Sequence, residues 1–336
     1  MNDPLRAIWG ALVGDACGAT LEFCDDEITE EMAVRAMTMP GGGSLRVGRG
    51  QITDDGELTL ALWSVLRGRE TFHGFPLEAV AKSYAAWYTS FPFDIGRTCS
   101  LAFDALHEWT HGDMELTDVL CNIDDMSRRS EANGALMRVT PIATWWASYP
   151  LERNGVCVEE TAQFAAAAAE QDARLSHPGR VTRDANAVYT YAVTLLLLGC
   201  SPADTVMCVE IMVRKRCAEV QRWVEESKRE LSDTRVLIGH VRHAFVAALW
   251  FLRRPEIGYA EAIYRILMRG GDTDTNAAIV GGLVACYQPI SEEMKEAVAT
   301  FDCCVEAQPP PSMEHFHRAM GRQRPRAYSV KYQVGS

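Results

Sequence analysis

The sequence is poor in three kinds of pattern, and each absence excludes a class of protein. Apolar and polar residues hardly ever alternate between turn residues, so a sheet-based fold is not expected. No apolar run approaches the length of about 18 residues that a membrane-spanning helix needs. The 11 cysteines are odd in number and include no C-x-x-C spacing, which argues against a disulfide framework and a zinc ribbon.

A secretion signal and a surplus of positive charge are also missing. Asp15 interrupts the short apolar run that follows Arg6, so this run is not a signal core. Together with the unpaired thiols, this predicts a cytoplasmic protein with no membrane partner. Lys and Arg number 33 against 45 Asp and Glu, which gives a net charge of −12. Nucleic acid is therefore not an expected partner except as a modified substrate, and a phosphate-bearing ligand must be held by local groups.

Helical periodicity, in contrast, is abundant. Apolar residues recur at helical spacing, or Ala and Leu dominate, over residues 58–66, 79–88, 158–169, 185–198, 206–223, 236–252, 260–267 and 277–285. We therefore predict an all-α fold of roughly a dozen or more helices. No shift in composition marks a boundary, so we expect one domain over residues 1–308, followed by an extended C-terminal tail over residues 309–336.

Three glycines recur every fourth residue near the N-terminus. Gly10, Gly14 and Gly18 would lie on one face of the first helix. Because glycine has no side chain, this face permits close approach of another backbone. We interpret the stripe as a packing feature.

Two short blocks place oxygen-bearing side chains where a loop meets an apolar helix. The candidate ligands are Thr53, Asp54, Asp55, Asp272, Asp274 and Thr275. An all-oxygen set selects Mg²⁺, Mn²⁺ or Ca²⁺ over zinc or copper, and four carboxylates suit two divalent ions better than one. The alternative is that each block is only a helix N-cap, a position that favours Thr and Asp. However, a cap needs one carboxylate, and each block has two.

Two further blocks are weaker when considered alone. Residues 130–138 form a polar, glycine-containing entry into an apolar helix, and exposed amides at a helix start can hold an anion such as a diphosphate. An ordinary capped helix is the alternative there. His177 follows Ser176, and a lone histidine is usually structural.

Together these blocks resemble the ADP-ribosylglycohydrolase family. The segments that carry the resemblance, in the family's order, are 10–23, 50–55, 133–138 and 270–276. Residues 41–46 and 93–99 are similar to the bacterial dinitrogenase-reductase-activating glycohydrolase branch, which hydrolyses ADP-ribosylarginine. The resemblance implies a compact orthogonal all-α bundle with a binuclear centre of two Mg²⁺, or Mn²⁺. Such an enzyme would remove ADP-ribose from a modified protein, with N-linked arginine as the leading acceptor.

The resemblance also implies residue roles. The six oxygen-bearing residues of the two blocks would be the metal ligands. Glu22 and Asp94 would be the catalytic acids, and either could move the proton. The residues placed around the ADP-ribose would be Ser130, Asn133, Gly134, His177 and, as a cation that offsets the diphosphate, Arg97.

The chain departs from the family pattern at three places. Gly56 stands where many members have Thr, Arg97 where the bacterial branch has asparagine, and Gly179-Arg180 where relatives often carry a second His-Pro. Hydrolysis of O-linked ADP-ribose, on serine, on nucleic acid or in O-acetyl-ADP-ribose, is therefore an alternative. A second alternative is an immunity-type protein that neutralises a cognate ADP-ribosyltransferase partly by binding. The expected partner is an ADP-ribosylated protein, with the transferase as a further possibility.

Overall fold

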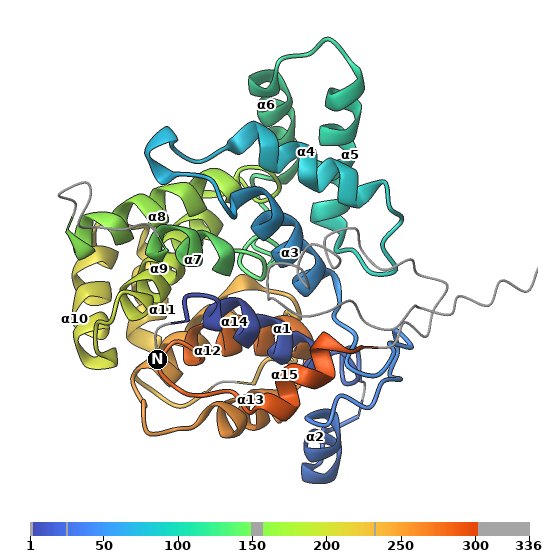
Figure 1. Cartoon of the computed structure of the whole chain (residues 1–336), viewed down its shortest axis with the longest axis vertical. Coiled ribbons are helices and arrows are strands. Elements are labelled where there is room, and N and C mark those ends of the chain that lie inside the picture. Colours follow the sequence, from blue (N-terminus) through green and yellow to red (C-terminus); the bar gives the residue numbers. More distant parts are fainter. Residues whose placement is uncertain (1–2, 25, 149–156, 232, 302–336) are drawn as a thin grey trace, which may run out of the picture.

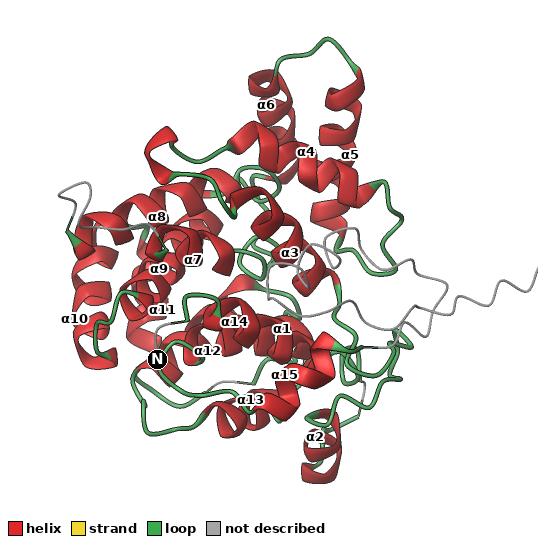
Figure 2. Ribbon diagram, in the orientation of Figure 1, coloured by secondary structure: helices red, strands yellow, loops and turns green. Residues whose placement is uncertain are grey.

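The computed structural model describes residues 3–24, 26–148, 157–231 and 233–301. Within these residues the chain forms fifteen α-helices and no strand (Figure 2), so the predicted all-α class is confirmed. The α-helices are α1 (Arg6–Gly18), α2 (Glu30–Ala36), α3 (Asp54–Leu66), α4 (Leu77–Tyr88), α5 (Arg97–His111), α6 (Leu116–Ser127), α7 (Thr140–Ala147), α8 (Val158–Ala173), α9 (Arg180–Leu197), α10 (Pro202–Met212), α11 (Ala218–Glu226), α12 (Val241–Leu252), α13 (Tyr259–Leu267), α14 (Thr273–Val284) and α15 (Glu292–Ala299). Short 3-10 turns lie at η1 (Thr71–His73) and η3 (Val213–Lys215).

Helices α1 and α14 lie side by side at the centre of the molecule (Figure 1). The glycine stripe of α1 faces α14 so closely that side chains do not fit. A Cβ on Gly14 would lie 2.1 Å from the carbonyl oxygen of Ala277, and a Cβ on Gly18 would lie 2.3 Å from the Cα of Asp274. The predicted close backbone approach is confirmed. It also fixes the start of α14, which carries two of the predicted metal ligands, against the end of α1.

The remaining helices surround this central pair. Helices α12 and α13 pack on α14, and α3 and α7 lie beside α1. Helices α8 and α9 form a second packed pair, while α4, α5 and α6 make the projection at the top of Figure 1. The buried apolar side chains form one continuous core cluster that runs from Ala7 to Phe301.

Two predicted helices have the wrong extent. The helix predicted over 206–223 is broken, because α10 and η3 end before an extended residue, Arg216, and α11 starts afterwards. The backbone N–H of Cys217 donates to Asp184 Oδ2 at 2.7 Å, and Arg216 Nη1 lies 3.2 Å from Asp184 Oδ1. A buried carboxylate on α9 therefore takes up backbone and side-chain donors at the break.

The helix predicted over 236–252 begins five residues later, at Val241. Leu237 and Gly239 both have positive φ values, 56° and 80°, which no α-helix accommodates. The imidazole Nδ1 of His240 then caps α12 by accepting from the N–H of Arg242 at 3.1 Å. The apolar residues at 236–238 are exposed and only imitate a helical pattern.

None of the helices in the described part of the chain has the length and apolar character that a membrane crossing needs. The nine cysteines in that part are free thiols, as predicted. The predicted tail at 309–336 lies outside the described residues, so the domain boundary stays a prediction.

Candidate metal centre

Carboxylates from separate loops meet beside the central helix pair. Glu22 follows the end of α1, while Asp272 and Asp274 sit at the start of α14. One oxygen from each of these three residues lies within 4.8 Å of the other two, a spacing that a single cation can bridge. Glu22, predicted as a catalytic residue, therefore belongs to the same cluster as two predicted metal ligands.

The two predicted ligand blocks interlock through their threonines. Thr53 Oγ1 lies 2.9 Å from Asp15 Oδ1 and 3.1 Å from Asp274 Oδ2, so it connects α1, α3 and α14. The hydroxyl of Thr275 donates to Asp55 Oδ2 at 3.1 Å. Residues more than two hundred positions apart in the sequence thus form one oxygen-rich site.

The interpretation of the blocks as plain helix caps is wrong. Thr53 is the N-cap residue of α3 and Asp272 that of α14, yet neither side chain makes a capping hydrogen bond. Asp15 satisfies the start of α3 instead, because its carboxylate accepts from the N–H of Thr53 at 3.0 Å and from that of Gly56 at 2.8 Å. The side chains of Thr53 and Asp272 are therefore not used to cap their own helices.

Asp15 is the site residue that the sequence interpretation missed. It is fully buried, and burial raises the pKa of its carboxyl to about 7. The signal was present, since Asp15 is the one acidic residue of helix α1 and lies among apolar residues and glycines. Asp15 also explains the departure at Gly56, because a Cβ there would lie 2.6 Å from Asp15 Oδ2. A threonine at this position would require Asp15 or Ile52 to shift.

The cluster carries more negative charge than its surroundings compensate. Burial, and then the neighbouring carboxylates, raise the pKa of Asp54, Asp55 and Asp274 well above the usual range. The same causes raise the pKa of Glu22 to about 9. Glu22 Oε2 and Asp55 Oδ1 are buried and have no hydrogen-bond partner among the described residues.

These orphaned oxygens are what a bound cation would satisfy. The donor set is all oxygen, which suits a hard divalent ion such as Mg²⁺ or Mn²⁺. An ion of charge +2 would also offset the repulsion between the carboxylates. The residues present therefore fit the predicted metal. The described residues include one acidic triad of this kind, and a second ion with Asp54 and Asp55 as ligands stays a prediction.

Stability in the metal-free state is expected to fall as the pH rises. The carboxyls of Asp15 and Glu22 have folded-state pKa values near 7 and 9, above their unfolded values near 4. Stability is thus greatest below pH 4 for these groups and is lost as the pH passes through 7 and then 9. Each such carboxyl contributes a slope of about 1.4 kcal/mol per pH unit in that window.

The measurement is urea unfolding between pH 5.5 and 9, once in EDTA and once in excess Mg²⁺. The EDTA curve should decline with pH, and the Mg²⁺ curve should be flatter, because a bound ion keeps the carboxylates ionised in the folded state. Parallel curves in the two solutions would contradict a cation site here.

One predicted substrate residue, Asn133, and one predicted catalytic acid, Asp94, lie directly beside the acidic cluster. Asn133 Nδ2 donates to Asp272 Oδ2 at 2.7 Å, and the N–H of Asn133 donates to the carbonyl of Gly239 at 2.9 Å. Asp94 lies next to Asp54, and burial raises the pKa of its carboxyl. Asp54 Oδ2 also accepts from the N–H of Gly96 at 3.4 Å, which links α3 to the start of α5.

The other predicted substrate residues lie farther along the same loops. A Cβ on Gly134 would lie 3.0 Å from the His177 ring, so these two residues are in close contact. His177 is buried, and burial, followed by the charge of Arg138, lowers its pKa to about 3. Its Nδ1 lies 2.9 Å from Ser176 Oγ, while its Nε2 has no partner among the described residues.

Ser130 contacts the first turn of α5, the helix that begins at Arg97. Ser130 Oγ and Thr98 Oγ1 are 2.9 Å apart, which joins the 130–138 block to α5. Arg97, the first residue of α5, has an exposed side chain. The structure therefore groups Asn133, Gly134 and His177, and it places Arg97 on the surface.

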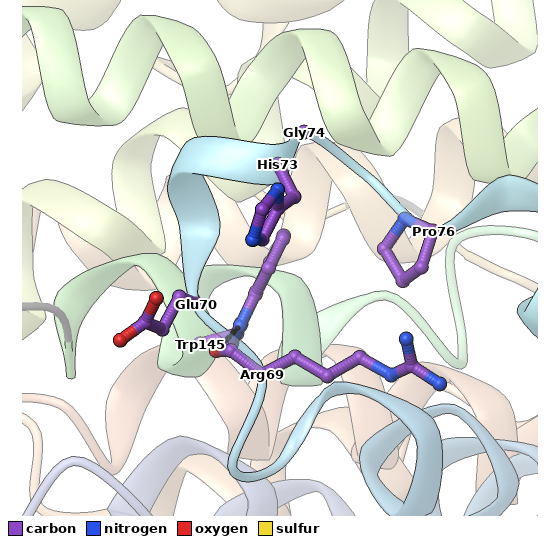
Figure 3. A pocket seen from close by; sticks show the side chains of 6 residues that line it. All are labelled: Arg69, Glu70, His73, Gly74, Pro76 and Trp145. Atoms are coloured by element: carbon purple, nitrogen blue, oxygen red, sulfur yellow. Dashed lines mark hydrogen bonds between the residues drawn. The ribbon is translucent and has the colours of Figure 1, made fainter.

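A hollow of about 320 Å³ lies elsewhere on the molecule (Figure 3). Its lining residues are Arg69, Glu70, His73, Gly74, Pro76 and Trp145. The indole N–H of Trp145 donates to the carbonyl of Arg69 at 2.8 Å, and the Arg69 and Glu70 side chains point in opposite directions. No candidate site residue lines this hollow, so it is separate from the acidic cluster.

Known proteins similar to this chain share one description. A family model described as ADP-ribosylglycohydrolase matches residues 4–320. A protein of Acanthamoeba polyphaga mimivirus, named as a proposed ADP-ribosyl glycohydrolase, is 28% identical over 295 residues, which are 83% of this chain and 84% of the viral protein. The ADP-ribosyl-(dinitrogen reductase) glycohydrolase of Rhodospirillum rubrum is 35% identical over 150 residues, which are 44% of this chain and 46% of that protein.

A solved structure titled ADP-ribosylglycohydrolase-related protein complex has a TM-score of 0.67 with this chain at 23% identity. The likeness covers 88% of this chain and 92% of the other. At this level of identity it shows a shared fold. The match to the Rhodospirillum rubrum protein spans less than half of either chain.

Proposed function

The chain belongs to the ADP-ribosylglycohydrolase family, and from this premise we propose that it is a metal-dependent hydrolase that releases ADP-ribose from N-linked arginine on a protein. The observation that carries this proposal is the buried carboxylate triad of Glu22, Asp272 and Asp274, whose oxygens lie within 4.8 Å of one another. A relative named for a dinitrogen reductase substrate supports a protein acceptor. The predicted family is confirmed, while the linkage belongs to the proposal.

The residues present divide into a metal side and a substrate side. The proposed metal ligands are Thr53, Asp54, Asp55, Asp272, Asp274 and Thr275. When bound, divalent ions of this kind orient ribose hydroxyls and lower the pKa of a bound water. On the substrate side, His177 is neutral because its pKa is low, and its free Nε2 offers one hydrogen bond to the diphosphate or the adjoining sugar.

We assign the proton transfer to Asp94. Glu22 is part of the triad that would hold a cation, so its carboxylate is committed to that role. Asp94 lies just outside the triad, and its raised pKa allows its carboxyl to hold or accept a proton at the anomeric centre. Cleavage at an anomeric carbon passes through an oxocarbenium-like state, which nearby carboxylates stabilise.

The proposal predicts a preference among linkages. With Mg²⁺, the enzyme should release ADP-ribose from an arginine-modified protein with a kcat/KM at least about tenfold above that for serine-linked ADP-ribose or O-acetyl-ADP-ribose, a difference of about 1.4 kcal/mol. EDTA should stop the release, and added Mg²⁺ should restore it. The measurement is chromatographic quantification of free ADP-ribose from each substrate under identical conditions.

Three results would redirect the proposal. A preference for the serine or O-acetyl linkage would replace arginine with an O-linked substrate. Release that is unaffected by EDTA would contradict the metal dependence. Full protection of a target from a transferase by an Asp55→Ala variant that releases no ADP-ribose would show that the protein acts by binding.

A further inference from the structure

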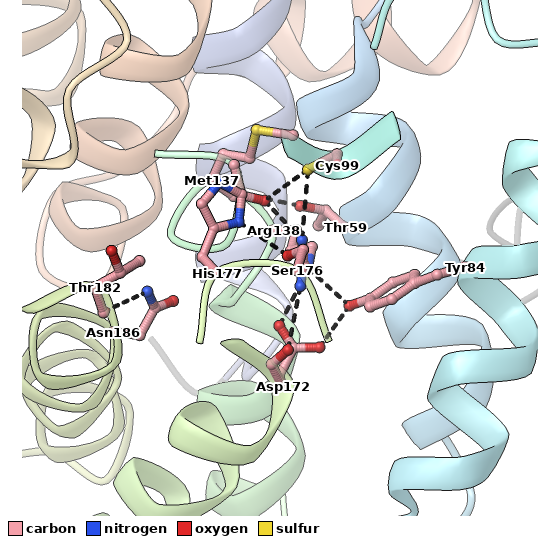
Figure 4. Close-up of polar contacts among 11 residues, drawn as sticks. Thr59, Tyr84, Cys99, Met137, Arg138, Asp172, Ser176, His177, Thr182 and Asn186 are labelled. Carbon is pink, nitrogen blue, oxygen red and sulfur yellow. Dashed lines mark hydrogen bonds and ion pairs between the residues drawn. The ribbon is translucent and has the colours of Figure 1, made fainter. Parts of the chain in front are cut away.

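A completely buried arginine lies behind the candidate substrate residues. Arg138 has no exposed surface, and neither does its partner Asp172, whose Oδ2 lies 3.1 Å from Arg138 Nε (Figure 4). The hydroxyl of Tyr84 donates to Asp172 Oδ1 at 2.7 Å and accepts from Arg138 Nε at 3.1 Å. The guanidinium also stacks over the Tyr84 ring, at 4.6 Å from the ring centroid.

By itself, a buried ion pair of this kind adds little net stability. Burial opposes the charge of Arg138, although Asp172 and Tyr84 raise its pKa overall. Moving two charges out of water costs about as much as their mutual attraction returns, so buried ion pairs often contribute little net stability. Their best-attested use is to fix one arrangement among several. Arg138 is therefore expected to hold neighbouring segments in one arrangement, and its contacts show which segments these are.

Arg138 connects two segments that carry predicted substrate residues. Its Nη1 donates to the carbonyl of Gly134 at 2.8 Å, and its Nη2 donates to the carbonyl of Asp172 at 3.2 Å. Gly134 follows Asn133, whose side chain holds Asp272. Asp172 lies near the end of α8, and the turn that follows it leads directly to His177, whose N–H donates to Ala173 at 2.7 Å.

We propose that Arg138 is a positioning residue that sets the spacing between the 133–134 loop and the turn at His177, and thereby shapes the place where the diphosphate of ADP-ribose binds. This inference rests on the proposed function for the identity of the ligand. A guanidinium suits the task, because its rigid fork reaches two acceptors on different segments at once. A lysine at 138 keeps the charge but presents a single point of contact.

A second arginine that pairs with a residue of α8 offers a matched control. Arg216 pairs with Glu170 on α8 and, at 3.2 Å, with Asp184 on α9. It therefore connects α8 to α9, at a position on α8 two residues before Asp172. None of these contacts involves the 133–134 loop. Arg216→Lys weakens the contacts of Arg216 by the same chemical change with which Arg138→Lys weakens the contacts of Arg138.

The test compares Arg138→Lys, Tyr84→Phe and Arg216→Lys with the wild-type enzyme. Hydrogen exchange should rise at least about tenfold, equivalent to 1.4 kcal/mol of opening free energy, for the amides of both Leu136 and His177 in Arg138→Lys. Titration calorimetry with ADP-ribose and Mg²⁺ should show a comparable loss of affinity. KM should rise more than kcat falls, which a general loss of stability would not produce. Arg216→Lys should leave all three measurements unchanged.

Tyr84→Phe removes only the hydroxyl that touches both Arg138 and Asp172. Tyr84→Phe should also raise hydrogen exchange and lower the affinity for ADP-ribose, by smaller factors than Arg138→Lys. If Arg138→Lys does not fold, Tyr84→Phe tests the inference in its place. Wild-type affinity in Arg138→Lys, or equal losses in Arg138→Lys and Arg216→Lys, would overturn the inference. Raised exchange and weakened ADP-ribose binding in Arg138→Lys, together with a wild-type protein that binds ADP-ribose but hydrolyses none of the substrates, would support the inference while the proposed function fails.

Discussion

Replacing Asp274 by asparagine is expected to abolish most of the hydrolase activity while making the metal-free protein more stable. Asp274 belongs to the carboxylate triad, and its Oδ2 lies 3.1 Å from Thr53 Oγ1. Loss of residues that merely support metal ligands costs about 10- to 100-fold in activity, so a ligand itself should cost about 100-fold or more in kcat/KM. Asparagine keeps the size of the side chain, so this loss would not come from a cavity.

The stability change has the opposite sign because the cluster repels itself. Glu22, Asp272 and Asp55 all act to raise the pKa of Asp274, in addition to the effect of burial. Asparagine carries neither this charge nor the proton that folding makes Asp274 take up, so a gain of about 1 kcal/mol in EDTA is expected, within the usual range for stabilising substitutions. Added Mg²⁺ should stabilise the variant less than it stabilises the wild-type protein. The measurements are steady-state release of ADP-ribose and urea unfolding with and without Mg²⁺.

Asp184 provides the control for this variant. It is also a buried aspartate, but it is paired with Arg216 and accepts the N–H of Cys217. Asp184→Asn should destabilise the protein by about 1–3 kcal/mol because buried donors lose a charged partner. It should leave kcat/KM and the response to Mg²⁺ unchanged. A drop in metal-free stability for Asp274→Asn as large as that for Asp184→Asn would contradict an uncompensated acidic cluster.

The sequence predicted the fold class and singled out each of the two oxygen-rich blocks for physical reasons that are local. Helical periodicity is set by the 3.6-residue repeat, and the stripe of Gly10, Gly14 and Gly18 can be recognised by spacing alone. Clustered carboxylates at helix starts stand out because ordinary caps need only one. These features depend on neighbours in the chain, so no knowledge of distant contacts was needed.

The features that the sequence did not predict depend on contacts between distant segments. The capping of α3 by Asp15 joins two helices, and the break at Arg216 follows from a carboxylate on α9. The helix predicted over 236–252 starts too early because its first three apolar residues match a helical pattern. In the fold they are exposed in a loop that includes a positive φ at Leu237. Glu22 is predicted as a catalytic acid near the metals, and the fold places it within the acidic triad itself.

The second large effect is expected for Gly18→Ala, which links the packing of the central helices to the metal site. Gly18 ends α1 and lies so close to α14 that a Cβ would meet the Cα and backbone N of Asp274 at 2.3 and 2.4 Å. Backbone atoms cannot rotate away as a side-chain tip can, so α14 has to shift. Overpacking of this kind costs about 1–3 kcal/mol. Because the displaced residue is itself a predicted ligand, Mn²⁺ affinity should fall about 10- to 100-fold, as it does when support for a metal ligand is lost.

Gly10→Ala separates this local effect from a general loss of stability. A Cβ on Gly10 would meet the Gly281 carbonyl oxygen at 2.2 Å, a clash of the same severity located two turns farther from the cluster. Its unfolding free energy should fall by a similar amount, about 1–3 kcal/mol, while calorimetric titration with Mn²⁺ should give the wild-type affinity. Equal losses of Mn²⁺ affinity in the two variants would show that the site responds to the stability of the α1–α14 pair as a whole. Loss in Gly18→Ala alone would show that the last turn of α1 holds Asp274 in its ligand position.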